Sequence, residues 1–135
     1  MVKNIIFTNG CFDILHIGHV KLLKFAKSLG DKLIVGVNSD ESVRRLKGAT
    51  RPINTLENRI EILQSLTCVD EVVSFDEDTP YNLITNIKPD IIVKGGDYNA
   101  NEVVGSDISK VIIYDLVGDI STTKILNHEK NTFTR

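Results

Sequence analysis

The stretch of sequence that decides the fold is Asn9-Gly10-Cys11-Phe12-Asp13-Ile14-Leu15-His16-Ile17-Gly18-His19. It follows an apolar run at residues 5–7 and precedes an amphipathic segment that predicts a helix over residues 18–29. Parallel α/β sheets bind ligands where a strand passes into a helix, and the unpaired N–H groups at a helix start attract phosphate. Because two histidines flank one glycine at this junction, the stretch predicts binding of a nucleoside triphosphate.

The composition is that of a soluble globular domain, with 41% hydrophobic and 25% charged residues in a chain of 135. The net charge of −2 argues against a surface devoted to nucleic acid or anionic lipid, so a phosphate site requires a local cluster. No segment approaches the ~20 consecutive apolar residues of a membrane span. Cys11 and Cys68 form no metal-ligand pattern, and the N-terminus has no signal peptide. We therefore expect a single cytoplasmic domain over residues 1–135.

Apolar runs alternate with helical patterns along the chain. Strands are expected at residues 4–8, 33–37, 69–75, 91–93 and 111–114. Helices are expected at residues 18–29, from 38–40 to 46, from 55 onward, at 79–88 and from 121 onward, with residues 99–110 irregular. This alternation predicts an α/β fold, a single doubly wound Rossmann-like domain with a five-stranded parallel sheet. The loops at 8–18, 38–51, 94–98 and 117–123 follow carboxyl ends of strands, which is where such sheets bind ligands.

Two common phosphate-binding motifs are absent from the chain. Gly10 stands alone until Gly18, so there is no G-x-G-x-x-G, and no P-loop sequence occurs. The pattern that is present is H-x-G-H, from His16 to His19. The plainer interpretation is that both histidines are ordinary helix-start residues.

The residues Thr8-Asn9-Gly10-Cys11-Phe12-Asp13 and His16-Ile17-Gly18-His19 resemble the cytidylyltransferase-like nucleotidyltransferase superfamily, in which G-[TC]-F-D precedes H-x-G-H. Further blocks resemble it in the same order: residues 37–40, 45–48 with 51–52, 57–59, 93–98 and 121–123. Class I aminoacyl-tRNA synthetases share the letters H-I-G-H, but this chain has no K-M-S-K-S and no room for an anticodon region. The resemblance implies the superfamily's α/β fold and transfer of a nucleotidyl group with release of pyrophosphate.

Two branches of the superfamily compete. Glycerol-3-phosphate cytidylyltransferases, which make CDP-glycerol, carry the motif R-T-E-G-I-S-T-T. This chain keeps I-S-T-T at residues 120–123, but Leu116 occupies the position of the arginine. Residues 45–52, 75–80 and 94–98 resemble the adenylyltransferase domain of ADP-heptose synthesis. The resemblance therefore favours transfer of AMP from ATP to heptose 1-phosphate, giving a nucleotide sugar for surface polysaccharide, lipopolysaccharide or capsule. The cytidylyltransferase is the alternative, and a non-catalytic nucleotide-binding module is a third possibility.

The candidate site residues fall into three groups. The catalytic candidates are His16, His19 and Lys47. The nucleotide-binding candidates are Thr8, Asn9, Gly10, Cys11, Phe12, Asp13, Gly18, Lys94, Gly96, Asp97, Ser121, Thr122 and Thr123. The acceptor-binding candidates are Arg45, Lys47, Arg51 and Arg59. The plainer alternatives are a solvated cationic loop at residues 44–51 and a simple helix cap at residues 121–123.

Several of these expectations concern partners. Mg²⁺ or another divalent cation is expected to be held mainly by the phosphates, with no protein ligand assigned. Asp13 would orient either its loop or the metal, and Cys11 is expected to pack rather than to act as a nucleophile. By analogy with relatives we expect a homodimer, and the resemblance implies a separate sugar kinase that supplies the acceptor.

Overall fold

The computed structural model describes residues 4–96 and 99–115. The strands are β1 (Ile5–Gly10), β2 (Lys32–Asn38), β3 (Glu71–Phe75), β4 (Ile91–Gly95) and β5 (Lys110–Tyr114). The helices are α1 (Ile17–Ser28), α2 (Asp40–Lys47), α3 (Leu56–Gln64) and α4 (Tyr81–Ile87), with a short 3₁₀ turn η1 (Ala100–Glu102). The strands form one parallel sheet in the order β3-β2-β1-β4-β5. The predicted doubly wound sheet of five strands is confirmed.

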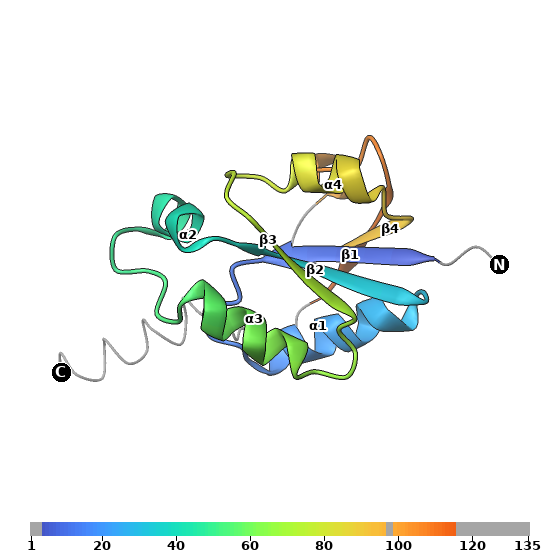
Figure 1. The fold of residues 1–135 in the computed structure, drawn as a ribbon. Helices are drawn as coiled ribbons and strands as arrows, with labels where there is room; N and C mark the ends of the chain where they lie inside the picture. Colours follow the sequence, from blue (N-terminus) through green and yellow to red (C-terminus); the bar gives the residue numbers. More distant parts are fainter. Residues whose placement is uncertain (1–3, 97–98, 116–135) are drawn as a thin grey trace.

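Helices cover both faces of the sheet, with α1 and α3 on one face and α4 on the other (Figure 1). Neighbouring strand residues point to opposite faces, and this alternation builds two cores. Ile6, Leu33 and Val93 join the core beneath α1 and α3. Phe7, Ile34 and Ile92 join the second core, which contains Ile84 of α4 and Val103. Burial on both faces explains why these strands read as continuous apolar runs.

The central strand β1 lies between β2 and β4. The chain winds outward from β1 through β2 to β3, and then crosses β1 to build β4 and β5 on the other side. Because the direction of winding changes between β1 and β4, the crevice outside their carboxyl ends is where such a fold binds ligands. The loop that contains residues 11–16 follows β1, so the H-x-G-H segment is at this crevice.

Some predicted boundaries differ from the structure. The third strand begins at Glu71 rather than residue 69, and α4 begins at Tyr81 with Pro80 at its N-cap. Residues 99–110, expected to be irregular, contain η1 and are anchored in the second core by Val103. Their polar anchor is Ser109, whose hydroxyl donates to the Pro89 carbonyl oxygen at 2.6 Å. The expected helix from residue 121 lies outside the described residues.

None of the helices in residues 4–96 and 99–115 has the length and apolar character needed to cross a membrane.

Candidate active site

The loop after β1 is held in an unusual backbone conformation. Phe12 has a φ of 49°, in the left-handed region that few residues other than glycine adopt. Its side chain is buried in the core beneath α1 and lies edge-on to the His19 ring, with centroids 5.1 Å apart. A Cβ atom at Gly10 would lie 3.1 Å from the Phe12 ring, tighter than an ordinary contact, so glycine gives the ring room for this close approach. Burial of Phe12 therefore stabilises the strained turn that leads into α1.

His16 and His19 form a reciprocal cap at the start of α1. Nδ1 of His16 accepts a hydrogen bond from the Gly18 N–H at 3.1 Å, and Nδ1 of His19 accepts one from the His16 N–H at 3.3 Å. The two rings are stacked, with centroids 3.8 Å apart. This is the geometry of a capping box, here made by two histidines in place of a hydroxyl residue and a glutamate. The H-x-G-H spacing thus has a structural role as well as a predicted chemical one.

The cap determines which nitrogen carries the proton in each ring. A neutral imidazole has one donor and one acceptor nitrogen, and both Nδ1 atoms accept, so the hydrogen-bond pattern assigns the proton to Nε2. Burial lowers the pKa of His16, while burial and the neighbouring His16 lower the pKa of His19 to about 4. Both rings are therefore neutral near pH 7. Each offers one Nε2–H donor, with which phosphate oxygens can pair.

Asp13 ties the loop after β1 to the segment between α2 and α3. Its carboxylate accepts from the N–H groups of Ile53 and Asn54 at 2.7 and 2.9 Å, and from Arg51 Nε at 2.7 Å. Burial alone would raise the pKa of Asp13, but these three donors outweigh it and hold the pKa below its usual range. Of the two predicted roles for Asp13, orienting its loop is the one that this geometry supports.

Arg59 is a second buried link, with no solvent exposure of its side chain. It donates to the carbonyl oxygens of Cys11 and Asn38, at 2.8 and 2.7 Å, and to that of Asn54 at 3.0 Å. Its fourth partner is Asp40 Oδ1 at 2.8 Å. The side chain thereby joins the ends of β1 and β2 to the loop before α3. These contacts support a positioning role for Arg59, and its contact with the acceptor stays a prediction.

The predicted cationic loop is divided by these contacts. The Arg51 side chain is nine-tenths buried against Asp13, and Arg45 pairs with Asp78 at 3.0 Å and with the Asp76 carbonyl oxygen. Lys47 is exposed at the end of α2, and in the described part of the chain no hydrogen bond or ion pair of its ammonium group is observed. Arg51 is therefore not part of a loop exposed to solvent, which was the plainer interpretation of residues 44–51. Among the cations predicted to bind the acceptor, Lys47 is the one whose charge remains exposed and without an observed partner in the described residues.

Lys47 lies within electrostatic reach of two other predicted residues. Burial raises the pKa of the Cys11 thiol, and the charge of Lys47 is the largest of the influences that lower it again. Burial also lowers the pKa of Lys94, with Lys47 lowering it further and Cys11 raising it. The charge of Lys47, at the end of α2, thus acts on Cys11 after β1 and on Lys94 in β4. The raised pKa of Cys11 agrees with its predicted packing role, because a thiol rather than a thiolate is favoured.

The remaining predicted nucleotide-binding residues have several placements. Thr8 is 2% exposed within β1, and Gly18 is buried in the first turn of α1. Asn9 lies at the end of β1, beside Lys94 in a common cavity. Gly96 follows β4 with a φ of 102°, and its N–H donates to the Tyr114 carbonyl oxygen at 3.2 Å. Asp97, Ser121, Thr122 and Thr123 lie outside the described residues.

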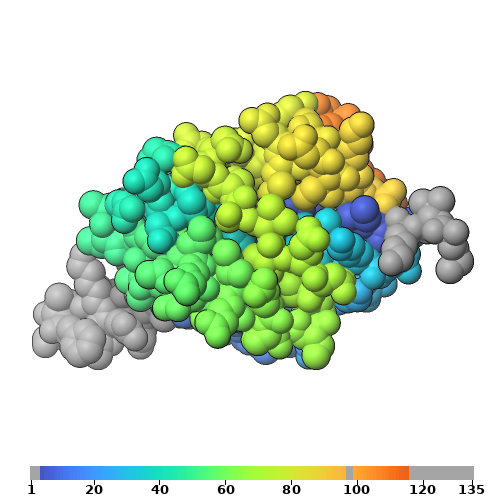
Figure 2. Space-filling view, in the orientation of Figure 1, coloured from blue at the N-terminus to red at the C-terminus, as the bar shows by residue number. Residues whose placement is uncertain are grey.

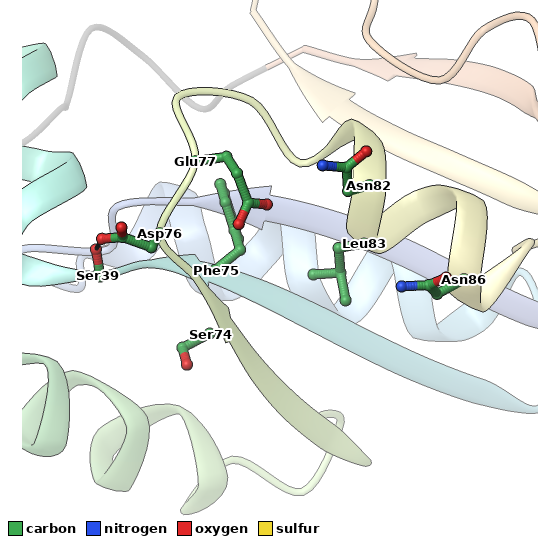
Figure 3. A pocket seen from close by; sticks show the side chains of 8 residues that line it. All are labelled: Ser39, Ser74, Phe75, Asp76, Glu77, Asn82, Leu83 and Asn86. Carbon is green, nitrogen blue, oxygen red and sulfur yellow. Dashed lines mark hydrogen bonds between the residues drawn. The ribbon is translucent and has the colours of Figure 1, made fainter.

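Two cavities adjoin the sheet, one near the ends of β1 and β4 and one along β3. The first, about 160 Å³, is lined by Asn9, Pro80, Lys94, Glu102, Val103 and Val104. The second, about 440 Å³, is an open groove along the edge strand β3, lined by Ser39, Ser74, Phe75, Asp76, Glu77, Asn82, Leu83 and Asn86 (Figure 3). In the surface view, β3 lies between α3 on one side and α4 on the other (Figure 2). Because the groove carries two carboxylates and no cation, it is poorly suited to phosphate.

Sequence reasoning missed Asn54 and Glu102. Asn54 connects Asp13 to Arg59 through its backbone N–H, its side chain and its carbonyl oxygen. Asn54 follows Pro52 in a loop, and nothing in the neighbouring sequence indicates that it links Asp13 to Arg59. Glu102 lies in a segment without helical or strand periodicity, and only the fold brings it to the cavity beside Asn9. Asp40, expected only as a possible helix cap, is the ion-pair partner of Arg59.

Known proteins are similar to this chain over most of its length. The "Bifunctional protein HldE" of a Nitratiruptor species is 62% identical over 130 residues, covering 96% of this chain. The same-named protein of Campylobacter concisus is 59% identical over 130 residues. The chain spans 28% of the length of each of these two relatives.

The fold is also shared with solved structures. The lipopolysaccharide core biosynthesis protein from Thermoplasma volcanium has a TM-score of 0.73 and 30% identity, over 88% of this chain and all of that one. A pantoate-beta-alanine ligase from Francisella tularensis, at 21% identity and a TM-score of 0.62, shares the fold. The family described as "Cytidylyltransferase-like" matches residues 7–127. The chain therefore belongs to the cytidylyltransferase-like family, as a domain of the nucleotidyltransferase type.

Proposed function

We propose that the chain transfers AMP from ATP to heptose 1-phosphate, releasing pyrophosphate and forming a nucleotide sugar for surface polysaccharide synthesis. The observation that carries the proposal is the histidine cap, which leaves two neutral Nε2–H donors at the start of α1, just after the loop that follows β1. The match to relatives named HldE supports the heptose branch, as does the likeness to a lipopolysaccharide core biosynthesis protein.

In the proposed reaction, an oxygen of the acceptor phosphate attacks the α-phosphorus of the nucleotide. A bond forms between these two atoms, the bond from the α-phosphorus to the bridging oxygen breaks, and pyrophosphate leaves with that electron pair. No proton transfer to the protein is required, so positioning and charge stabilisation account for most of the catalysis. His16 and His19 donate to oxygens that gain charge as the bond breaks. Lys47 holds the acceptor phosphate, and Lys94 lies between the two substrates.

Mg²⁺ belongs to this proposal as a phosphate-bound ion. In the described residues no three His, Cys, Asp or Glu side chains gather in a way that would hold a metal. Asp13 is committed to Arg51, Ile53 and Asn54, so its carboxylate is not offered as a ligand. The phosphate oxygens would therefore supply most ligands beside water, and the ion would neutralise charge on the triphosphate.

Further parts of the proposal concern partners and residues outside the described ranges. Asp97, Ser121, Thr122 and Thr123 are proposed to bind the nucleotide, as the family resemblance implies. A sugar kinase would supply heptose 1-phosphate, and the chain is proposed to work as a homodimer. We also propose that it acts in the cytoplasm, where ATP is available.

A substrate matrix tests the function and its alternative. ATP and CTP are each combined with heptose 1-phosphate and with glycerol 3-phosphate in the presence of Mg²⁺, and pyrophosphate release is measured. We expect release with ATP and heptose 1-phosphate to exceed the other three pairs. Preference for CTP with glycerol 3-phosphate would instead establish the alternative, a glycerol-3-phosphate cytidylyltransferase. None of the relatives described above supports that alternative. Tight ATP binding without pyrophosphate release from any pair would indicate a non-catalytic module.

A further inference from the structure

The cavity of about 160 Å³ beside Asn9 and Lys94 has a chemical character that the phosphate site does not explain. Its wall contains one carboxylate, Glu102, together with the apolar side chains of Pro80, Val103 and Val104. Lys94 in the same wall offsets the charge of Glu102, so the lining has no net positive charge with which to hold the triphosphate itself. It suits an uncharged group with hydroxyls on some faces and C–H groups on others.

The position of the cavity in the fold also separates it from the histidines. Pro80 precedes α4 and Val103 packs in the core beneath α4, whereas His16 and His19 begin α1 on the opposite face of the sheet (Figure 1). Asn9 and Lys94, at the ends of β1 and β4, lie between the two. Phosphoryl transfer places the attacking and leaving oxygens roughly in line on opposite sides of phosphorus. If pyrophosphate leaves on the α1 side, the acceptor approaches from the α4 side, where the cavity lies.

Glu102 has the exposure and bonding capacity to contact a ligand there. Its Oε1 accepts one hydrogen bond, from Asn99 Nδ2 at 3.2 Å, and no other partner of the carboxylate is observed in residues 4–96 and 99–115. A carboxylate has about four acceptor positions, so most remain for hydroxyl donors. Val104 is 36% exposed, which is ample for a large apolar side chain to pack against the C–H face of a sugar ring.

We propose that this cavity holds the hydroxylated sugar of the acceptor, and that Glu102 is a specificity-determining residue that accepts hydrogen bonds from its hydroxyls. The inference rests on the proposed function and names the part of the structure that selects the acceptor. With Lys47 holding the phosphate and the cavity holding the sugar, the acceptor would extend from the end of α2 across β1 and β4. The cavity, at about 160 Å³, is large enough for part of a sugar, since a site for a whole drug-sized ligand is typically ~300 Å³ or more.

The test uses Glu102→Gln in the full chain, with Glu77→Gln as the matched control. Glu77 is also an exposed glutamate that lines a cavity, but that cavity is the groove beside β3. Initial rates are measured at varied heptose 1-phosphate and varied ATP. We expect Glu102→Gln to raise the KM for heptose 1-phosphate by about 10-fold, as for loss of a hydrogen bond to a charged group, with the KM for ATP unchanged. Val104→Phe, which fills the cavity, should do the same, and Glu77→Gln should change neither KM.

Two results would overturn the inference. An increase in the KM for ATP alone would assign the cavity to the nucleotide, and unchanged constants in both Glu102→Gln and Val104→Phe would remove it from the site. Titration calorimetry with heptose 1-phosphate separates this inference from the proposed function. If the wild-type chain releases no pyrophosphate, the function fails, while a 10-fold weaker Kd in Glu102→Gln still supports the sugar site. Equal affinities of wild type and variant would contradict it.

Discussion

The imidazole rings of His16 and His19 are stacked 3.8 Å apart, and the Nδ1 atom of each accepts a backbone N–H from the turn that the two residues enclose. The same two residues therefore begin α1 and orient two hydrogen-bond donors. A cationic pair at this separation would be repelled electrostatically, and both pKa values are lowered. The site thus presents two neutral donors rather than two positive charges.

The protonation state of the histidines can be measured directly. Long-range ¹H–¹⁵N NMR spectra should show His16 and His19 as neutral Nε2–H tautomers at pH 7, with His19 remaining neutral until the pH approaches its pKa of about 4. Spectra of the single variants assign the two signals. A His19 that becomes protonated near pH 6.5, the usual pKa of histidine, would contradict the burial and stacking described here.

Substitution of His16 can separate its cap from its chemistry. Asparagine is a good N-cap residue, so His16→Asn should keep α1 stable while removing the Nε2–H donor; alanine removes both. We expect turnover to fall by at least ~10²-fold in both variants, because a transition-state donor is lost. Only His16→Ala should also lose stability, by about 1 kcal/mol in chemical denaturation. Near-wild-type turnover in His16→Asn would show that the cap is the only role of this histidine.

Lys47 is predicted to bind the acceptor phosphate. Lys47→Ala should raise the KM for the phosphorylated acceptor by more than the KM for ATP, because one charge-assisted contact is removed. Arg44→Ala is the matched control, since Arg44 is also exposed in the last turn of α2 and has no predicted role. Equal effects of the two substitutions would indicate a general field of positive charge rather than a specific contact.

Asp13 is predicted to stabilise the fold through its buried contacts with Arg51, Ile53 and Asn54. Asp13→Asn should lower the free energy of unfolding by about 3 kcal/mol, the usual cost of breaking a buried ion pair. Glu71→Gln, which breaks the exposed pair with Lys32, should cost less than about 1 kcal/mol. The two values are compared by urea denaturation at pH 7.

The Asp13 contribution should also depend on pH in a defined direction. Because its pKa is lowered in the folded state, the stabilisation is fully present above the ordinary aspartate value and is lost as the pH falls through the folded-state pKa. The difference between wild type and Asp13→Asn should therefore shrink only at acid pH, below about 4. A difference that disappears already between pH 7 and 5 would point to another group.

The number of strands and their places along the chain were predictable because each strand has a simple local signal, whereas their order in the sheet was not predicted. Residues 33–37 and 91–93 are continuous apolar runs, and the structure buries them between two helical layers. The histidine motif was predictable as a helix start because the amphipathic pattern of the helix follows it directly. Its double cap was not, because histidine is not among the usual N-cap residues.

The cations show the limit of reading charge along the chain. Arg45 and Arg51 belong to the predicted cationic loop and Arg59 to the helix after it, yet each is paired with an aspartate distant in sequence. These partners, Asp78, Asp13 and Asp40, are brought together by the winding of β1, β2 and β3. Sequence spacing carries no information about such contacts, so the distinction between Lys47 and its arginine neighbours required the fold.

The central claim is that this chain joins a nucleotide to a sugar phosphate, and ³¹P NMR of a single reaction mixture tests it most directly. The mixture contains the full chain, ATP, Mg²⁺ and heptose 1-phosphate. We expect equal amounts of pyrophosphate and of a new diphosphate-linked sugar nucleotide, with both signals appearing at least ~10²-fold more slowly in His16→Asn. Absence of both signals from the wild-type mixture, or their persistence at the wild-type rate in His16→Asn, would contradict it.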